Sequence, residues 1–229
     1  MNPILFTLAI FVTACLLVFG ISFIFSGLLG LSRRIFLLPY IIFSSAFLIY
    51  FFQSAIPVTF NFWTHNWTWG LLIALIAGVF LVRNIYSQPA SQDKKGKGLL
   101  FDIFWFGFAY GAIDGLILNV MPVVAAETMI NQSTSAGGFS IVLLKAVCAI
   151  SASLIITLLY HLGYKEFRNK SILMVLLGNT IITLTFVISG NPLAAILSHT
   201  AMHIAAVIRG PETTLQLPPH YGKTEIIYG

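Results

Sequence analysis

Seven long apolar runs dominate this chain, and each is close to the length needed to cross a bilayer. A hydrocarbon core of about 30 Å takes about 20 helical residues, and every backbone polar group inside it must be hydrogen-bonded within the protein. The sequence therefore predicts an all-α, multi-pass bundle of seven transmembrane helices over residues 1–210, followed by a short cytoplasmic tail over 211–229. The expected spans cover residues 3–31, 35–57, 67–82, 99–124, 139–163, 171–189 and 192–208.

Composition supports a membrane protein. The chain is 58% hydrophobic and 8% charged, whereas soluble domains carry about 25% charged residues. The net charge of +5 comes from 12 basic and 7 acidic residues, so it describes loops and not a nucleic-acid surface. We expect the lipid bilayer as a partner and no nucleic acid; the sequence leaves protein partners open.

Basic residues alternate between successive loops. The second, fourth and sixth loops contain no Lys or Arg, while the other loops and the tail do. Since cytoplasmic loops collect Lys and Arg, this pattern predicts an outside N-terminus and an inside C-terminus. Short loops without sorting signals favour a bacterial cytoplasmic membrane. The basic residues are Arg33 and Arg34; Arg83, Lys94, Lys95 and Lys97; Lys165, Arg168 and Lys170; and Arg209 and Lys223.

Ionisable and amide side chains within the spans are few. A charged group at the membrane centre is costly unless it has a partner, so these residues are the first place to look for function. Asp102 lies near the inner edge of its span, where we expect it to reach water. The residues that we single out are Asp102, Asp114, Lys145, His161, Asn179, His199 and His203.

The fourth span carries a glycine stripe beside one of its acids. Gly107, Gly111 and Gly115 recur every four residues, so they share one face, where a neighbouring backbone can approach closely. Asp114 borders this stripe and should face protein. At about 1.5 Å per residue it lies roughly 22 Å from the inner edge, and His199 lies roughly 12 Å below the outer edge. The two residues are therefore expected at similar depth.

His199 and His203 are four residues apart, so both imidazoles project from one helix face. Together with Asp114 they could bind a divalent transition metal. The alternatives are hydrogen bonds from the two histidines to neighbouring helices, a proton relay, or haem ligation. His161 is the only other histidine within a span, and its expected position near the inner edge does not match the depth that a facing haem ligand needs.

The stretch Gly190–His199, with sequence GNPLAAILSH, followed by His203, resembles the late histidine-containing helix of the CAAX protease and bacteriocin-processing family of intramembrane proteases. In that family a Glu-Glu-x-x-x-Arg motif supplies an activating glutamate. Here Glu166 and Arg168 are the nearest match, with one glutamate and a different spacing. His203 stands where the family usually has Asn or Asp. The resemblance implies an intramembrane hydrolase with His199 and Glu166 in its site.

Three functions follow as hypotheses. The first is an intramembrane hydrolase, or a degenerate relative of one, with His199 and His203 as site residues and Asp114 or Glu166 as the acid. The second is a proton- or cation-coupled transporter of small solutes that uses Asp114, His199 and His203. The third is a non-catalytic membrane scaffold. Phosphate-binding glycine loops and His-Glu-x-x-His motifs are absent from the sequence, so it carries no common nucleotide or zinc-protease signature.

Overall fold

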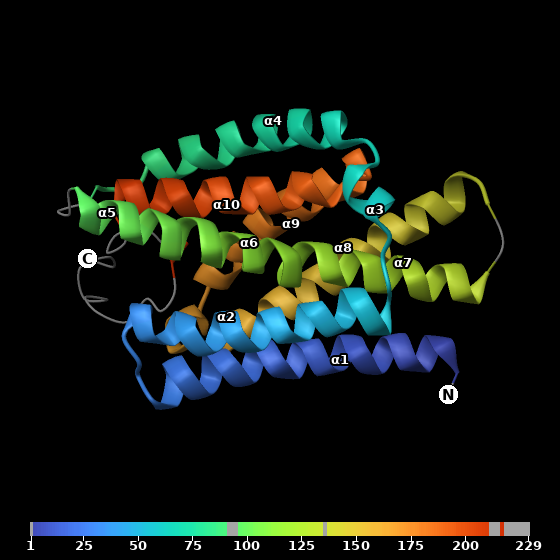
Figure 1. Cartoon of the computed structure of the whole chain (residues 1–229), viewed down its shortest axis with the longest axis horizontal. Coiled ribbons are helices and arrows are strands. Elements are labelled where there is room, and N and C mark those ends of the chain that lie inside the picture. The colour runs from blue at the N-terminus through green and yellow to red at the C-terminus, as the bar shows by residue number, and fades with distance from the viewer. Residues whose placement is uncertain (1, 91–95, 135–136, 211–215, 218–229) are drawn as a thin grey trace.

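A computed structural model describes residues 2–90, 96–134, 137–210 and 216–217. These residues form helices joined by turns and short loops (Figure 1). The predicted tail over 211–229, apart from Gln216 and Leu217, lies outside the described residues, and so do the loop residues Lys94 and Lys95.

Seven helices are long and apolar enough to cross a membrane, which confirms the all-helical, multi-pass prediction. They cover Pro3–Leu28, Arg33–Ala55, Trp67–Tyr86, Lys97–Ser133, Phe139–Leu162, Ser171–Ser189 and Pro192–Arg209. Several contain π-helical turns, labelled η. In order, the elements are α1 (Pro3–Ile21), η1 (Ser22–Leu28), α2 (Arg33–Tyr50), η2 (Phe51–Ala55), α3 (Phe60–Thr64), α4 (Trp67–Tyr86), α5 (Lys97–Asp102), η3 (Ile103–Ala109), α6 (Tyr110–Asp114), η4 (Gly115–Val120), α7 (Met121–Ser133), α8 (Phe139–Leu162), the 3₁₀ turn η5 (Lys165–Phe167), α9 (Ser171–Ser189) and α10 (Pro192–Arg209).

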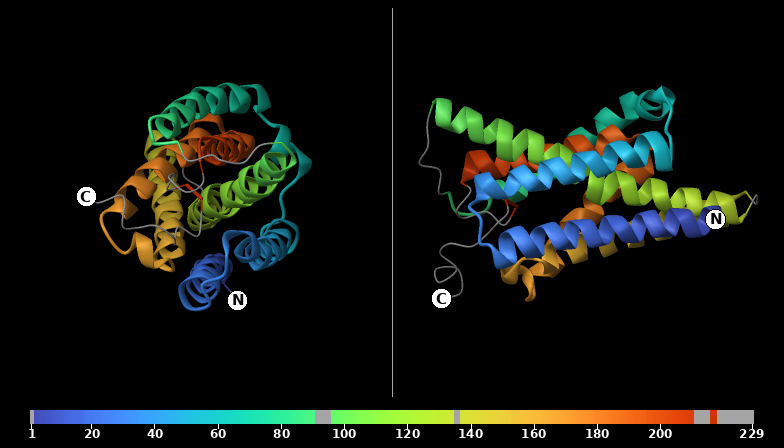
Figure 2. Two further views of the ribbon diagram at one scale, coloured as in Figure 1. Left: turned by 90° about the vertical axis from the view of Figure 1, so that its left-hand side faces the viewer. Right: turned by 60° about the horizontal axis from the view of Figure 1, so that its bottom comes forward.

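The fourth membrane helix, α5 to α7, is the central element of the bundle. It runs without a break for 37 residues, to Ser133 and not to residue 124 as expected from the sequence. Of its most hydropathic 18 residues 72% are buried, the largest share among the seven helices. In the end-on view of Figure 2, α4 and α10 lie on one side of it and α1 and α2 on the other.

The glycine stripe of the central helix packs directly against α10. A β-carbon added at Gly111 would lie 2.9 Å from Thr200 Cα, and one at Gly115 would lie 2.9 Å from Ile196 Cα. One at Gly107 would lie 3.1 Å from Ile204 Cα. Because real β-carbons essentially never approach other atoms within 3.0 Å, glycine lets the two backbones meet along two turns, as the spacing predicts.

The start of α10 is held by one asparagine. Asn191 caps the helix, because its Oδ1 accepts a hydrogen bond from the Leu193 N–H at 2.9 Å, and Pro192 follows it at the first helical position. The Asn191 amide also donates to the carbonyl oxygens of Trp63 and His65, at 3.0 and 2.6 Å. These contacts with the segment before α4 fix where α10 begins. They thereby also fix the position of His199 and His203 along the long axis of the bundle.

Asp102 does not reach water, contrary to the expectation from its position near the end of a span. Its side chain is fully buried, and one oxygen lies 3.0 Å from the Arg34 guanidinium, whose own side chain is about half exposed. The arginine places its charge toward the polar end of the bundle while it neutralises the buried carboxylate. This ion pair joins the start of α2 to the start of the central helix.

The close approach at Gly111 makes a testable prediction about stability. We expect Gly111→Ala to lower the free energy of unfolding by about 1–3 kcal/mol, because the new methyl group overpacks the contact with Thr200. Gly20→Ala in α1, where no atom lies within 4 Å of the added carbon, is the matched control and should be neutral or stabilising. Thermal unfolding in detergent measures the midpoint temperature of each variant. Equal midpoints for the two variants would contradict the close packing of Gly111 against Thr200.

Candidate functional site

The structure brings Asp114, His199 and His203 together in the interior. Asp114 Oδ2 lies 3.7 Å from His199 Nε2 and 3.6 Å from His203 Nε2. One ligand atom from each residue falls within 4.8 Å of the other two. The three residues are only 2%, 5% and 2% exposed. The imidazole rings stack, with centroids 4.9 Å apart, as expected for residues one helical turn apart on the same face of α10.

His199 is oriented by an asparagine on the central helix. Its Nδ1 lies 2.7 Å from Asn119 Oδ1. The Asn119 amide nitrogen is used elsewhere, because it donates to Asn179 Oδ1 at 2.8 Å and to Thr183 Oγ1 at 2.9 Å. Since a carbonyl oxygen only accepts, His199 Nδ1 must carry the proton. In the neutral ring Nε2 then presents a lone pair toward Asp114.

The network behind Asn119 ties three helices together. Asn179 Nδ2 donates to Ser153 Oγ at 2.8 Å, and Ser153 Oγ lies 2.7 Å from Thr183 Oγ1. Ser153 also donates to the Leu118 carbonyl oxygen at 2.6 Å. All of these side chains are buried. Because α8, α9 and the central helix each contribute hydrogen-bonding groups, the position of the His199 ring is set by a satisfied polar cluster.

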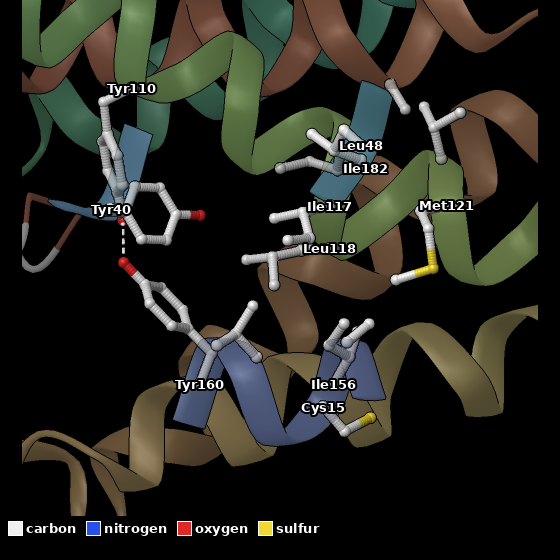
Figure 3. Close-up of a cluster of buried hydrophobic side chains, with 14 of the residues drawn as sticks. Cys15, Tyr40, Leu48, Tyr110, Ile117, Leu118, Met121, Ile156, Tyr160 and Ile182 are labelled. Carbon is white, nitrogen blue, oxygen red and sulfur yellow. Dashed lines mark hydrogen bonds between the residues drawn. The ribbon is translucent and has the colours of Figure 1, made fainter. Parts of the chain in front are cut away.

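Tyrosines surround the other side of the carboxylate. The Tyr40 hydroxyl donates to Asp114 Oδ1, which leaves Oδ2 to face the two histidines. The Tyr110 ring packs edge-on against His203, with centroids 4.7 Å apart. Figure 3 shows Tyr40, Tyr110 and Tyr160 converging, with the hydrogen bond between the Tyr110 and Tyr160 hydroxyls. These groups from α2, α6 and α8 hold the carboxylate in one orientation.

His203 is buried without hydrogen bonds. Neither ring nitrogen has a hydrogen-bond partner among the described residues. A buried polar group without a partner costs about 1–3 kcal/mol, so such groups in native proteins point to a bound ion or water. The lone pair of His199 Nε2 faces Asp114 Oδ2 as well, and two hydrogen-bond acceptors facing each other need a cation or proton between them. Both observations favour a bound cation at this position.

The arrangement fits a tetrahedral metal site with an open position. Bonds of about 2.0–2.1 Å in tetrahedral geometry place ligand atoms about 3.3 Å apart, within a few tenths of an ångström of the separations from Asp114 Oδ2. Two imidazoles and one carboxylate are a ligand set typical of catalytic zinc. Asn119 and Tyr40 supply the outer hydrogen bonds that such ligands require.

A cavity of about 180 Å³ adjoins the three residues. Asp114, His199 and His203 line its inner end, and Asn84, Gln88 and Gln216 line it near the end of the bundle where α4 and α10 finish. His161 also lines this cavity, although the sequence placed it near the inner edge and away from the other histidines. Its Nδ1 donates to the Thr157 carbonyl oxygen at 2.8 Å, so Nε2 is the acceptor nitrogen of the neutral ring.

Glu166 is not brought to the site. It lies in the 3₁₀ turn between α8 and α9 and, with Lys165, lines a separate hollow beside the end of the first membrane helix. It does not line the cavity that holds Asp114 and the histidines. Of the four residues predicted for the site, three meet and Glu166 stands apart, because a turn rich in basic residues stays at the end of the bundle.

Asn119 and Tyr40 were missed by the sequence analysis. Asn119 follows Asp114 by five residues, which in a regular α-helix places the two side chains far apart around the axis. Residues 115–120 form π-helical turns, whose hydrogen bonds join residues five apart, so Asn119 turns toward α10 with Asp114. The sequence signal that could have identified Asn119 was an amide side chain inside an apolar span. Tyr40 had no such signal, because aromatic residues are frequent in this chain.

No protein-family model, curated protein or solved structure matches this chain.

Asn119→Leu tests whether the amide positions a metal ligand. We expect the native protein to bind one equivalent of Zn²⁺, and the variant to bind it about 10–100-fold more weakly, because His199 Nδ1 loses its acceptor. Competition with a chelator in detergent measures the affinity. Val120→Leu, one residue further on the same helix, is the control for adding bulk to the core. Equal zinc affinity in the native and Asn119→Leu proteins would contradict the role of Asn119.

Proposed function

We propose that this chain is a metal-dependent intramembrane hydrolase whose site is formed by Asp114, His199 and His203. The observation that carries the proposal is the cluster itself, in which three ligand atoms lie within 4.8 Å of one another at the inner end of a cavity. A buried carboxylate faces two imidazoles, one of which has no hydrogen-bond partner among the residues described, and a divalent cation would best satisfy this group. Three protein ligands would leave such a cation a fourth position for water or substrate, which is typical of catalytic sites.

The residues around the cavity supply what hydrolysis needs. A divalent metal held there would polarise a water molecule and the carbonyl oxygen of a substrate. His161 lines the same cavity with Nε2 as its acceptor nitrogen, so it can take the proton that the attacking water loses. The water oxygen then bonds to the carbonyl carbon, the bond to the leaving group breaks, and His161 returns the proton to that group. The net reaction consumes one water.

The resemblance of residues 190–199 to the late histidine-containing helix of intramembrane proteases supports a hydrolase that uses His199. Glu166 has no part in this proposal, because it lines a different hollow. Asp114 on the central helix is the acid instead, as a metal ligand.

A proton-coupled transporter is the second candidate, and a chain of hydroxyl groups favours it. The Tyr164 hydroxyl donates to Tyr160 at 2.7 Å, and Tyr160 lies 3.0 Å from the Tyr110 hydroxyl. Tyr164 follows the end of α8, and Tyr110 contacts His203, so the chain leads from the end of the bundle to the site. Hydrogen-bonded chains of this kind serve as proton relays in membrane proteins.

Hydrolysis can be tested before the substrate is known. Lipids and membrane proteins extracted from the host membrane are incubated in oxygen-18 water with zinc-loaded native protein in liposomes. We expect new oxygen-18 carboxylates in the products. Asp114→Asn should lose both zinc and activity. His161→Ala should keep its zinc and lose activity by about 10²–10⁴-fold, because it lacks the proton acceptor.

Metal-loaded native protein that incorporates no more label than metal-free protein would overturn the hydrolase. Dissipation of a pH gradient by the same liposomes, abolished by Tyr160→Phe, would then favour the transporter. Tyr50→Phe, on an exposed face of α2, is the matched control for that substitution.

We also propose that the end of the bundle carrying Arg83, Arg168 and Arg209 faces the cytoplasm of a bacterium, with the N-terminus outside. Consecutive membrane helices run in opposite directions, so the loops with basic residues meet at one end. Lys and Arg concentrate in cytoplasmic loops, which supports this orientation.

Cysteine labelling of intact cells tests the orientation. In a background with Cys15 and Cys148 replaced by alanine, Ser140→Cys lies exposed at the start of α8 and Asn169→Cys lies exposed at the opposite end. We expect an impermeant maleimide to label Ser140→Cys in intact cells and Asn169→Cys only after permeabilisation. The reverse pattern would show that the chain is inserted the other way.

A further inference from the structure

The cavity opens to the surface between α4 and α9. Its rim includes two exposed side chains, Asn84 on α4 and Met174 on α9, whereas Asp114 and His203 at its inner end are buried. Gly178 lines the cavity between rim and site, and no atom lies within 4 Å of the position of an added β-carbon there. The gap between these two helices is therefore an open path from the surface of the bundle to the proposed metal.

The surface that lines this path is mainly apolar. Leu81 and Ile85 from α4 face Val175 and Ile182 from α9, and Met202 adds a flexible side chain. A peptide chain threaded through it would bury amide groups that such side chains cannot satisfy, which is unfavourable. An alkyl chain has no such groups. The walls thus favour a hydrocarbon chain over a polypeptide.

Polar side chains line the cavity at its two ends, and Tyr110, Thr157, His161 and Asn179 line it as well. Asn84, Gln88 and Gln216 lie toward the end of the bundle, and the metal-ligand cluster lies inside. The Thr157 hydroxyl lines the cavity and is buried without a hydrogen-bond partner among the described residues. A substrate matching this pattern carries one hydrolysable carbonyl group next to an apolar chain and a polar leaving group.

Size limits the occupant to a single chain. The cavity of about 180 Å³ is slightly larger than the roughly 150 Å³ cavity that holds a benzene molecule in another protein. It therefore takes the carbonyl group and only a few neighbouring carbons, and the rest of the chain must extend through the opening. Two chains side by side would not fit.

We infer that the substrate is a single-chain acyl compound, an ester or amide of an unbranched fatty acid, which enters between α4 and α9. This inference rests on the proposed hydrolase. The water oxygen bonds to the acyl carbon as the carbon–oxygen or carbon–nitrogen bond breaks. The products are the fatty acid and an alcohol or amine, and the leaving group takes the proton.

Alkyl hydroxamates test the chain without knowledge of the natural substrate, because the hydroxamate group binds metal and the alkyl group probes the cavity. The protein is loaded with Co²⁺, and binding of lauroyl and acetohydroxamic acid is followed by Co²⁺ absorption. After correction for partition into detergent, we expect the lauroyl compound to bind at least tenfold more tightly. Gly178→Leu should weaken lauroyl binding at least tenfold and leave Co²⁺ and acetohydroxamate binding within twofold. Gly20→Leu in α1 is the matched control.

The outcomes separate the two proposals. A protein that holds Co²⁺ and binds acetohydroxamate, but gains nothing from the lauroyl chain, overturns the acyl substrate and leaves the hydrolase standing. Tighter binding of a peptidyl hydroxamate than of the lauroyl compound would also overturn the acyl substrate and leave the hydrolase standing. A native protein that binds no Co²⁺ overturns both. The comparison of chain lengths uses the native protein alone, so it holds even if Gly178→Leu does not fold.

Discussion

The contact between the glycine stripe of the central helix and α10 is the constraint on which the site depends. Gly107, Gly111 and Gly115 let the backbone of α10 approach so closely that an added β-carbon would lie about 3 Å from its α-carbons. In hydrocarbon, where helices gain little from burying apolar surface, such packing is what holds neighbouring helices together. The same stripe meets α10 at Ile196, Thr200 and Ile204. His199 and His203 each precede one of these contacts by one residue and therefore face Asp114 beside the stripe.

The polar groups of the site form two parts that differ in how well they are satisfied. Behind His199, Asn119 and its partners on α8 and α9 use their donors and acceptors in a closed network. In front, lone pairs of His199 and Asp114 face each other, and His203 has no hydrogen-bond partner in the part of the chain that the structure describes. A membrane interior gives unsatisfied groups no water, so this imbalance has a cost that a ligand would remove. The satisfied part fixes the geometry, and the unsatisfied part is where we propose that a metal ion binds.

Much of the fold was predictable from the sequence, because length, apolar content and loop charges determine how many helices cross a bilayer. The group of Asp114, His199 and His203 was also within reach, since the four-residue spacings of the glycines and histidines define faces and helix rise gives depth. The continuous helix to Ser133 was not, because its last residues are polar enough to read as a loop; they continue the helix although residues 131–133 are exposed. The contact of Asn119 with His199 was not predictable, because it depends on the π-helical register of residues 115–120. The place of His161 in the cavity was not predictable either, because an estimate of depth along the membrane normal does not show which helices touch.

X-ray absorption spectroscopy of the purified, zinc-loaded protein tests directly whether Asp114, His199 and His203 hold one metal ion, as we propose. We expect a first shell of nitrogen and oxygen only, at about 2.0–2.1 Å, with outer-shell scattering from two imidazoles. The double variant His199→Ala/His203→Ala should lose both the metal and that signature. A native protein without bound zinc, or a first shell unchanged in the double variant, would contradict the claim.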